Sequence, residues 1–513
     1  MSNEIIKNLS FGTEARDNVF RGIDKLYLAV SSTLGASGKC VLLEDSSGKP
    51  IVTKDGVTVA NAVTLIDPVE NMGATLLKQA ARKTVEEAGD GTTTATILAH
   101  SIISECQKIE GFSEREIKSS VNSATTKVLK YLEDRSKEVT GDMLKHIATI
   151  SANNDEEIGE IISSAFNASG KGGVVTMEIS RDEETSFEVV NGATLDQPLK
   201  NFHFITNKDT GACVLNNPLI LIVENKIESI RKIESILAYV IKNKKELLII
   251  GDADEQVVSA LAMNKIKGNI KVNVVDAPDY GIHRKEKMHD LAMITGATVI
   301  NEDLGDDMDL IQPEHLGSCL KATTNREETI LEVESLSDEV KELIERVKIQ
   351  IEETNLPGKK IQLEKRLAVL SCKVSVIKVG ANSEIELKEK SDRVEDAICA
   401  TRAAIKQGIL PGGGVALLNA SDKVRPSNDI EKAFLKAIRR PYEVIMTNGE
   451  YEEIIYDKRT GYGVDVKTGK VVDMIKSGII DPLLVTKSAL KNAVSVATTI
   501  MSTNCVISNL RQM

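Results

Sequence analysis

The middle of the chain, between residues 218 and 300, alternates short apolar runs with helical patterns. Strands joined by helices in this order predict β-α-β units on a parallel sheet. This section is therefore expected to be an α/β domain of its own. The apolar runs are Leu219–Val223, Leu247–Ile250, Val272–Val275 and Val299–Ile300, and the helical patterns are Glu228–Ile241, Asp254–Ile266 and His283–Thr295.

The parts of the chain on either side of this section are mainly helical in pattern. Because 513 residues exceed what one core usually supports, about two to four domains are expected. The predicted elements are a helix over Arg16–Leu34, a hairpin of Cys40–Glu44 and Pro50–Thr53, a helix pair over Leu336–Ile351 and Ile361–Leu370, a strand over Ser375–Gly380, a helix over Arg393–Gln407 and a two-stranded piece around Tyr451–Val472.

The octapeptide Gly89–Thr96 lies between two helical patterns and has no bulky apolar side chain. Its two glycines let the backbone approach a ligand closely. The threonines that follow begin a helix, whose free N–H groups and positive dipole suit a phosphate. Asp90 adds a carboxylate, the ligand type that Mg²⁺ prefers. The alternative is a glycine cap followed by a threonine cap with no ligand, and the octapeptide alone does not decide between them.

Composition limits the classes of partner and compartment. A net charge of −12, from 64 basic and 76 acidic residues, argues against nucleic acid or an anionic membrane as the main partner. Seven cysteines form no CxxC pair and have no metal-like spacing to the six histidines, which indicates a reducing compartment. Residues 1–10 lack an apolar signal core, and no apolar run reaches membrane-spanning length. We therefore expect a cytoplasmic protein.

Several separated stretches resemble the large subunit of the bacterial-type (group I) chaperonins. The resemblance runs from about residue 5 to residue 509, and its most specific parts are Gly89–Thr96 and the spacing from Asp396 to Gly414. The chain is identified as a divergent member of that family. The stretches are Thr53–Val57, Glu70–Ala74, Gly89–Thr96, Thr149–Asn153, Arg393–Ala397, Ala400–Ala404 and Gly412–Leu417.

The resemblance implies an α+β multidomain chaperonin fold with three domains in nested order. A mainly helical equatorial domain, for ATP binding and ring assembly, would take residues 1–136 and 408–513. A small α/β intermediate hinge domain would take 137–191 and 374–407. An apical α/β domain with parallel strands, for polypeptide binding, would take 192–373. The nested order also explains why nucleotide motifs occur at both ends of the chain.

The resemblance places an ATP site in the equatorial domain, with Mg²⁺ as cofactor and K⁺ as an optional second cation. Asp90 would hold Mg²⁺, and Asp481 would accept hydrogen bonds from the ribose hydroxyls. Asp465 stands at a base contact where the family commonly has Asn. The residues matched to nucleotide contacts are Leu34, Gly35, Lys54, Asp90, Gly91, Thr92, Thr93, Thr94, Ile150, Ser151, Gly413, Asp465, Ile479 and Asp481.

Two carboxylates are matched to catalysis. Asp396 belongs to the intermediate domain and would orient the attacking water when that domain closes over the nucleotide. Asp55 would lie near the γ-phosphate and the water. Without the resemblance, Asp396 would be read as a helix-surface residue near Arg393. After Leu34-Gly35 the family has proline, where this chain has Ala36-Ser37-Gly38, and we expect weaker nucleotide handling as a result.

The resemblance also implies an exposed apolar groove on the apical domain for non-native polypeptides and, in alternation, a co-chaperonin. Apolar contact is non-directional and tolerates many partners. Two departures weaken this match, because Glu234 replaces an apolar residue and His203 replaces a tyrosine. The alternative for the apolar members is core packing. The matched residues are Leu199, His203, Phe204, Leu237, Val258, Ala262 and Met263.

Family members assemble seven-membered homo-oligomeric rings, one or two of them. Here Glu443 stands at the position of an inter-ring arginine and Tyr451 at that of its glutamate partner, which predicts weak ring pairing.

Gly192 matches one hinge strand, but Cys372 and Lys373 replace two small residues on the other. The chain ends at Met513 without the family's Gly/Met-rich tail.

Three hypotheses remain from the sequence. The first is an ATPase that drives protein folding inside a ring. The second is a metabolic enzyme with the same phosphate loop, which would need an acid, base or nucleophile cluster that residues 192–373 do not offer. The third is a divergent paralogue that keeps the fold and binds protein but barely hydrolyses ATP or has changed clients. The presence of both Asp90 and Asp396 argues against an inactive ATPase, whereas Glu234 and the missing tail leave changed clients open.

Overall fold

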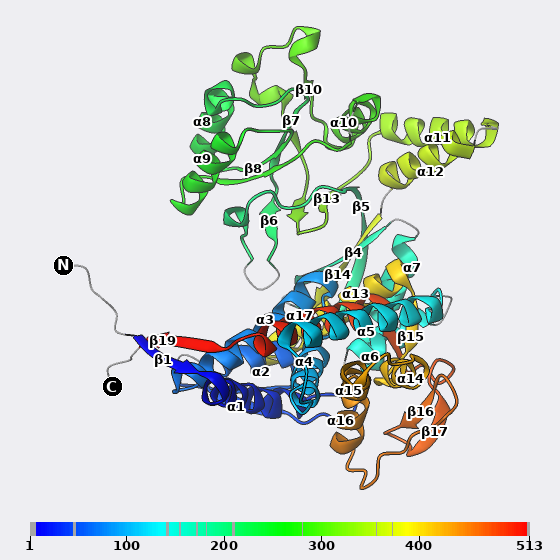
Figure 1. Ribbon diagram of the computed structural model, residues 1–513. Helices are drawn as coiled ribbons and strands as arrows, with labels where there is room; N and C mark the ends of the chain where they lie inside the picture. Colours follow the sequence, from blue (N-terminus) through cyan, green and yellow to red (C-terminus); the bar gives the residue numbers. More distant parts are fainter. Residues whose placement is uncertain are drawn as a thin grey trace. The chain divides into compact units, whose positions relative to one another are not determined.

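The computed structural model describes residues 7–44, 48–139, 143–152, 155–170, 173–180, 182–207, 211–279, 281–354, 357–371 and 373–509. The chain forms two compact units (Figure 1). The first comprises Met1–Ser163, Ile179–Thr185 and Val379–Met513, and the second comprises Ser164–Glu178 and Ser186–Lys378. Both ends of the chain therefore belong to one unit, and the division into three functional domains stays a prediction.

Helices build the first unit. Val19, Ile23 and Leu26 recur at helical spacing on the first helix and are buried, as an amphipathic pattern requires. Asp67 caps α3 by accepting the N–H groups of Val69 and Glu70. The helices are α1 (Gly12–Ser31), α2 (Gly56–Ala62), α3 (Pro68–Ala88), α4 (Thr92–Cys106), α5 (Glu114–Arg135), α6 (Met143–Ser151), α13 (Glu384–Gln407), α14 (Val415–Lys423), α15 (Asp429–Ala437), α16 (Arg440–Asn448) and α17 (Leu483–Met501); α7 (Glu156–Ser169) runs on into the second unit.

Four two-stranded antiparallel sheets complete the described part of the first unit. The strands β1 (Lys7–Phe11) and β19 (Cys505–Asn509) pair from Lys7 opposite Asn509 to Phe11 opposite Cys505. This pairing joins the two ends of the chain, and no sequence pattern predicted it. The other pairs are β2 (Val41–Glu44) with β3 (Pro50–Thr53), β15 (Ile409–Pro411) with β18 (Ile480–Pro482), and β16 (Tyr462–Asp465) with β17 (Lys470–Asp473).

The second unit contains the α/β section that the sequence predicted. The order β10-β7-β8-β9 is parallel throughout, and a short β11 pairs antiparallel with β7. Their apolar residues are buried on both faces, as expected of a parallel sheet. The elements are β7 (Leu219–Val223), β8 (Glu246–Ile250), β9 (Lys271–Val275), β10 (Val299–Ile300), β11 (Gly317–Ser318), α8 (Glu234–Lys242), α9 (Glu255–Ile266) and α10 (Gly281–Thr295).

A second sheet of this unit has the order β4-β14-β5-β13-β12-β6. The helix pair α11 (Asp338–Glu353) and α12 (Pro357–Leu370) confirms the predicted antiparallel pair. Lys373 begins β14, whereas the prediction on Cys372 lies outside the described residues, as does that on 510–513. The strands are β4 (Val174–Ile179), β5 (Ser186–Leu195), β6 (Cys213–Asn216), β12 (Lys321–Thr324), β13 (Thr329–Val333) and β14 (Lys373–Val379); short 3-10 helices are η1 (Phe202–Phe204), η2 (Ile230–Ile233), η3 (Glu302–Leu304), η4 (Met308–Leu310) and η5 (Pro313–His315).

None of the helices in the described ranges is long and apolar enough to cross a membrane.

Candidate functional site

The first unit contains a cavity of about 710 Å³ whose walls come from both ends of the chain. All sixteen residues that the resemblance matched to nucleotide binding and catalysis line it. They are Leu34, Gly35, Lys54, Asp55, Asp90, Gly91, Thr92, Thr93, Thr94, Ile150, Ser151, Asp396, Gly413, Asp465, Ile479 and Asp481. Segments more than 300 residues apart in sequence thus meet at one place, with no single element forming the site.

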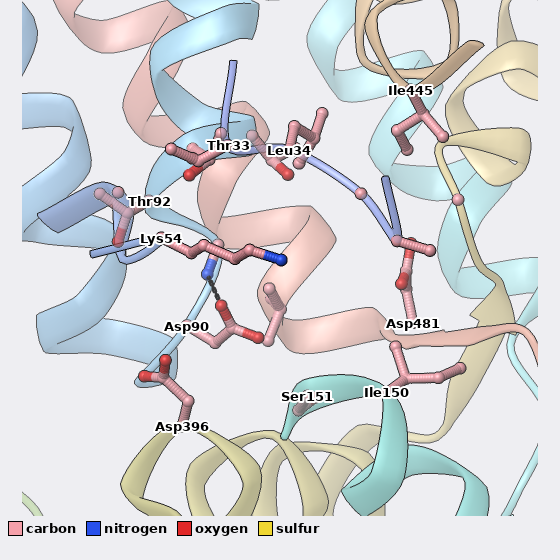
Figure 2. A pocket seen from close by; sticks show the side chains of 18 of the residues that line it. Thr33, Leu34, Lys54, Asp90, Thr92, Ile150, Ser151, Asp396, Ile445 and Asp481 are labelled. Carbon is pink, nitrogen blue, oxygen red and sulfur yellow. Dashed lines mark hydrogen bonds between the residues drawn. The ribbon is translucent and has the colours of Figure 1, made fainter. Parts of the chain in front are cut away.

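The threonine loop has the geometry that an anion site needs. Gly91 precedes α4 with a φ of 94°, a conformation that costs other residues free energy. The helix then begins at Thr92, so the N–H groups of its first turn have no carbonyl partner within the helix. Thr92, Thr93 and Thr94, which carry these groups, line the cavity. The Asp90 carboxylate accepts the N–H of Gly91, which fixes the carboxylate at the start of the helix (Figure 2).

The loop after β3 packs directly against this helix start. A Cβ atom on Gly56 would lie 2.2 Å from the Oγ1 of Thr93, so only glycine permits the contact. Asp55 caps α2, because its two carboxylate oxygens accept the N–H groups of Val57 (3.1 Å) and Thr58 (2.7 Å). A carboxylate oxygen has a second lone pair, so this cap leaves Asp55 able to accept from a bound molecule as well.

Two further side chains reach toward Asp90 from opposite walls. Figure 2 shows Lys54 extending into the space beside Asp90, and Asp396 pointing from α13 toward the loop that carries Asp90. Three residues before Asp396 on the same helix, Arg393 forms ion pairs with Asp155 (3.0 Å) and Glu389 (2.8 Å). Asp396 therefore lines the cavity in this structure, with its helix tied to Asp155.

Asp90 and Asp396 are destabilised in their charged form. Burial raises the pKa of Asp90, and the nearby Asp55 raises it further, while the Gly91 N–H opposes the shift. Burial, followed by the charges of Asp90 and Asp55, raises the pKa of Asp396 well above its ordinary value. Both carboxylates are only partly buried, so water limits the free-energy cost of their ionised forms. Such a cavity is stabilised by a cation.

The carboxylates suit a metal that brings most of its own ligands. The described residues contain no group of three or more His, Cys, Asp or Glu side chains placed to hold a metal ion. Mg²⁺ commonly takes one or two protein carboxylates and completes its shell with water and phosphate oxygens. A single ligand, Asp90, beside the start of α4 fits that pattern.

The other end of the cavity is apolar and was only partly predicted. Gly413 and Ile479 line it as expected, together with Tyr442 and Met474. Tyr442 and Met474 belong to one buried cluster whose other buried members are Val415, Leu418, Met446 and Val464. Neither Tyr442 nor Met474 was predicted, because the apolar pattern around them is that of an ordinary core. A flat aromatic base would fit against this surface.

Asp481 lines the cavity between its carboxylate-lined end and its apolar end. Burial and the charge of Asp90 raise its pKa to about 7, against the N–H groups of Gly413 and Gly414. The folded state therefore holds a proton that the unfolded state releases near pH 4, so stability falls as pH rises from about 4 to 7.

We predict that Asp481→Asn removes this pH dependence. In the nucleotide-free protein, the variant and the parent should unfold at the same temperature near pH 4, and the variant should unfold several degrees higher at pH 8. Scanning calorimetry across this range measures the difference. Parallel curves for the two proteins would contradict the assigned burial of the charge.

In the second unit the structure corrects the predicted polypeptide surface. Phe204, Val258 and Ala262 are buried in the core, so they are not surface contacts. The reason is the turn of η1 against α9, which directs Phe204 inward and leaves Phe202 68% exposed. His203 and Met263 are exposed as expected, Leu199 and Leu237 are half-buried, and Glu234 is exposed.

Comparison with known proteins relates both units to one family. A model of the TCP-1/cpn60 chaperonin family matches residues 26–511. Among solved structures, the chain is similar to the chaperonin gp146 from the bacteriophage EL 2 (Pseudomonas aeruginosa), crystallised in the presence of ATP-BeFx. Crystal form II has a TM-score of 0.70 at 22% identity, covering 100% of both chains. Crystal form I has a TM-score of 0.63 at 21% identity, covering 98% of this chain and 99% of that one.

Proposed function

The chain belongs to the TCP-1/cpn60 chaperonin family, and from this premise we propose that it is an ATP-driven ring chaperonin that captures non-native polypeptides and promotes their folding in a central cavity. The observation that carries the proposal is the meeting of all sixteen matched residues in one cavity. The chaperonin from bacteriophage EL 2 was crystallised with ATP-BeFx, which supports a nucleotide as the ligand here. Binding of ATP to the purified protein, measured by calorimetry with and without Mg²⁺, tests the assignment.

In this proposal the threonine loop receives the phosphates. The first-turn N–H groups of α4 and the hydroxyls of Thr93 and Thr94 donate to phosphate oxygens. Asp90 holds Mg²⁺, which neutralises phosphate charge when bound. Lys54 adds a positive charge to the same space. Ile150, Ser151, Leu34 and Gly35 close the cavity around the nucleotide.

The other end receives the nucleoside. Gly413 and Ile479 lie against the adenine, and Asp481 accepts from the ribose hydroxyls. Asp465 is matched to a base contact. Its carboxylate accepts from the Lys467 N–H (3.0 Å) and the Thr468 hydroxyl (2.7 Å), which fixes its position and leaves lone pairs that can accept from the base.

Asp396 performs the chemical step. A carboxylate held above the phosphate loop accepts a hydrogen bond from water and orients it for attack on the γ-phosphate. Burial and, after it, the charges of Asp90 and Asp55 raise the pKa of Asp396, and a cation bound in the cavity would lower this pKa. Asp55 supports the same water with its remaining lone pairs.

We further propose that an apolar face on the second unit binds clients. This apolar face consists of Phe202 (68% exposed), Met263 (53%) and Ile266 (55%). They belong to η1 and α9, which pack against each other, and Lys265 donates to the Ile205 carbonyl between them. Exposed aromatic, thioether and branched side chains suit a binder of many unfolded chains.

Phe202→Glu is expected to reduce capture of a denatured client by roughly tenfold or more, because a buried carboxylate must lose its water. Capture is measured by fluorescence anisotropy of a labelled, denatured client, with ATPase activity measured in parallel. Ile349→Glu, at an exposed position of α11, is the matched control and should capture normally. Normal capture by Phe202→Glu would move the client site elsewhere.

Ring assembly is proposed through the strand pairs of the first unit. Phe11 on β1 and Leu42 on β2 are 62% and 70% exposed, and apolar strand surface of this kind is normally covered by a partner. Seven copies related by rotation would cover it.

For the contact between rings, the negative charge of Glu443 is compensated within its own subunit. The carboxylate lies 3.2 Å from Arg440 and 3.1 Å from the Tyr456 hydroxyl. The expected repulsion between rings is weaker for that reason, and whether rings pair stays a prediction.

A further inference from the structure

The turn that connects α1 to β2 is one wall of the cavity and has little stiffness of its own. Within residues 32–39 there are two glycines and no proline. The Gly38 N–H donates to the Gly35 carbonyl (2.9 Å), and the Lys39 N–H donates to the Ser32 carbonyl (2.8 Å). Gly35 has a φ of 87°, a conformation that favours glycine. Because glycine has more backbone freedom than other residues, ordering the turn at this position costs more conformational entropy.

An asparagine on another helix holds this turn. The amide nitrogen of Asn448, the last residue of α16, donates to the Ser31 and Leu34 carbonyls, each at 2.9 Å. Both partners are carbonyl oxygens, which only accept, so the amide must present its N–H₂ side to them. One side chain therefore joins the end of α1 to the first cavity-lining residues of the turn.

The same helix packs against the turn along its length. The side chain of Ile445 lies 3.1 Å from the position that a Cβ on Gly35 would occupy. Leu34 packs in a small cluster with Tyr27, Ile97 and Val444. Apolar contact thus presses the turn onto α16, but it is non-directional. The backbone hydrogen bonds of the turn are made within the turn and the end of α1, whereas the two hydrogen bonds of Asn448 fix the Ser31 and Leu34 carbonyls relative to α16.

We propose that Asn448 is a positioning residue for the nucleotide, which orders the Leu34–Gly35 turn before the ligand binds. The inference rests on the proposed function, since it takes the ligand of the cavity to be a nucleotide. Without Asn448, ligand binding would have to order the turn and lose affinity in proportion. Because the turn is ordered before binding, the effect falls on the ground state and not on the chemical step.

The test is calorimetric binding of ATP and ADP, together with steady-state ATP hydrolysis, on the assembled full-length protein. Asn448→Ala should raise the dissociation constants of both nucleotides by about tenfold, as expected for two lost hydrogen bonds. The value of kcat should stay within about twofold, so KM carries the effect. Thr447→Ala is the matched control: this neighbouring exposed side chain bonds only back along its own helix, to the Glu443 carbonyl (2.9 Å), and should leave both values unchanged.

A rescue separates positioning from a general loss of structure. Ala36 is the second residue of the Gly35–Gly38 turn, the position that proline favours. Asn448→Ala combined with Ala36→Pro should therefore recover part of the lost affinity, by stiffening the turn from within. Should Asn448→Ala not fold, Asn448→Gln makes the same test, because one added methylene displaces the amide from both carbonyls.

These measurements test the role of Asn448 separately from the proposed nucleotide-binding function. If the parent protein binds no nucleotide, the proposed function is overturned, and this inference with it. If the parent binds and Asn448→Ala binds equally well, or loses kcat and affinity together without rescue, only the role of Asn448 is overturned. A tenfold loss in affinity for both nucleotides, with kcat kept and affinity partly restored by Ala36→Pro, supports it.

Discussion

Replacing Asp396 by asparagine is expected to lower ATP turnover by roughly 10- to 1000-fold, while the dissociation constant for ATP changes by less than about threefold. The side chain lines the cavity from α13 and points toward the loop of Asp90. Asparagine keeps its size but cannot serve as a base. An interaction used mainly in the transition state is therefore lost, and binding in the ground state is kept.

Single-turnover and steady-state hydrolysis, with binding measured separately, check this expectation. Glu386→Gln is the matched control, because it removes an exposed carboxylate of the same helix that neither lines the cavity nor acts on the pKa of Asp396. It should hydrolyse ATP at nearly the parental rate. Parental turnover by Asp396→Asn would show that the water is oriented by another group, with Asp55 the next candidate.

Replacing Asp90 by asparagine should instead abolish tight binding of Mg-ATP. We expect a loss of about 100-fold or more, equivalent to about 3 kcal/mol, because a charged metal ligand is removed from a buried site. In the parent, Mg²⁺ should strengthen ATP binding; in the variant, affinity for ATP should hardly depend on Mg²⁺.

The Asp90→Asn variant should also change the pKa of Asp396. The charge of Asp90 is one cause of the raised pKa of Asp396, so removing it should lower the pKa of Asp396. A magnesium-dependent affinity that persists unchanged in Asp90→Asn would exclude Asp90 as the ligand. Magnesium titrations at fixed ATP, read by calorimetry, decide the point.

Features set by local periodicity were predictable from the sequence. The strands and helices of residues 218–300 occur close to the predicted bounds, because each pattern depends on neighbours along the chain. The exception is the helix predicted from Glu228, where the 3-10 helix η2 (Ile230–Ile233) comes first and α8 begins only at Glu234. The loop Gly89–Thr96 was recognisable because its chemistry is contained in eight consecutive residues.

Features set by tertiary contact were not. Strands β1 and β19 pair although they lie at opposite ends of the chain. A pattern of neighbouring residues cannot predict a pair between strands so far apart in sequence. The assignment of Phe204 to the surface was wrong because two phenylalanines two residues apart, Phe202 and Phe204, differ only in how η1 meets α9. Tyr442 and Asn448 were missed because α16 looks like any short core helix until the turn it holds is known.

The proposed chaperonin function requires that the protein captures non-native polypeptide and that ATP changes its hold on it, which is measured with a labelled, chemically denatured client bound to the purified protein. Fluorescence anisotropy is followed on addition of Mg-ATP, and separately on addition of ADP. We expect high initial anisotropy, a fall on addition of Mg-ATP, and a much smaller fall with the Asp90→Asn variant. A client that never binds, or one that stays bound equally with and without Mg-ATP in the parent protein, would contradict it.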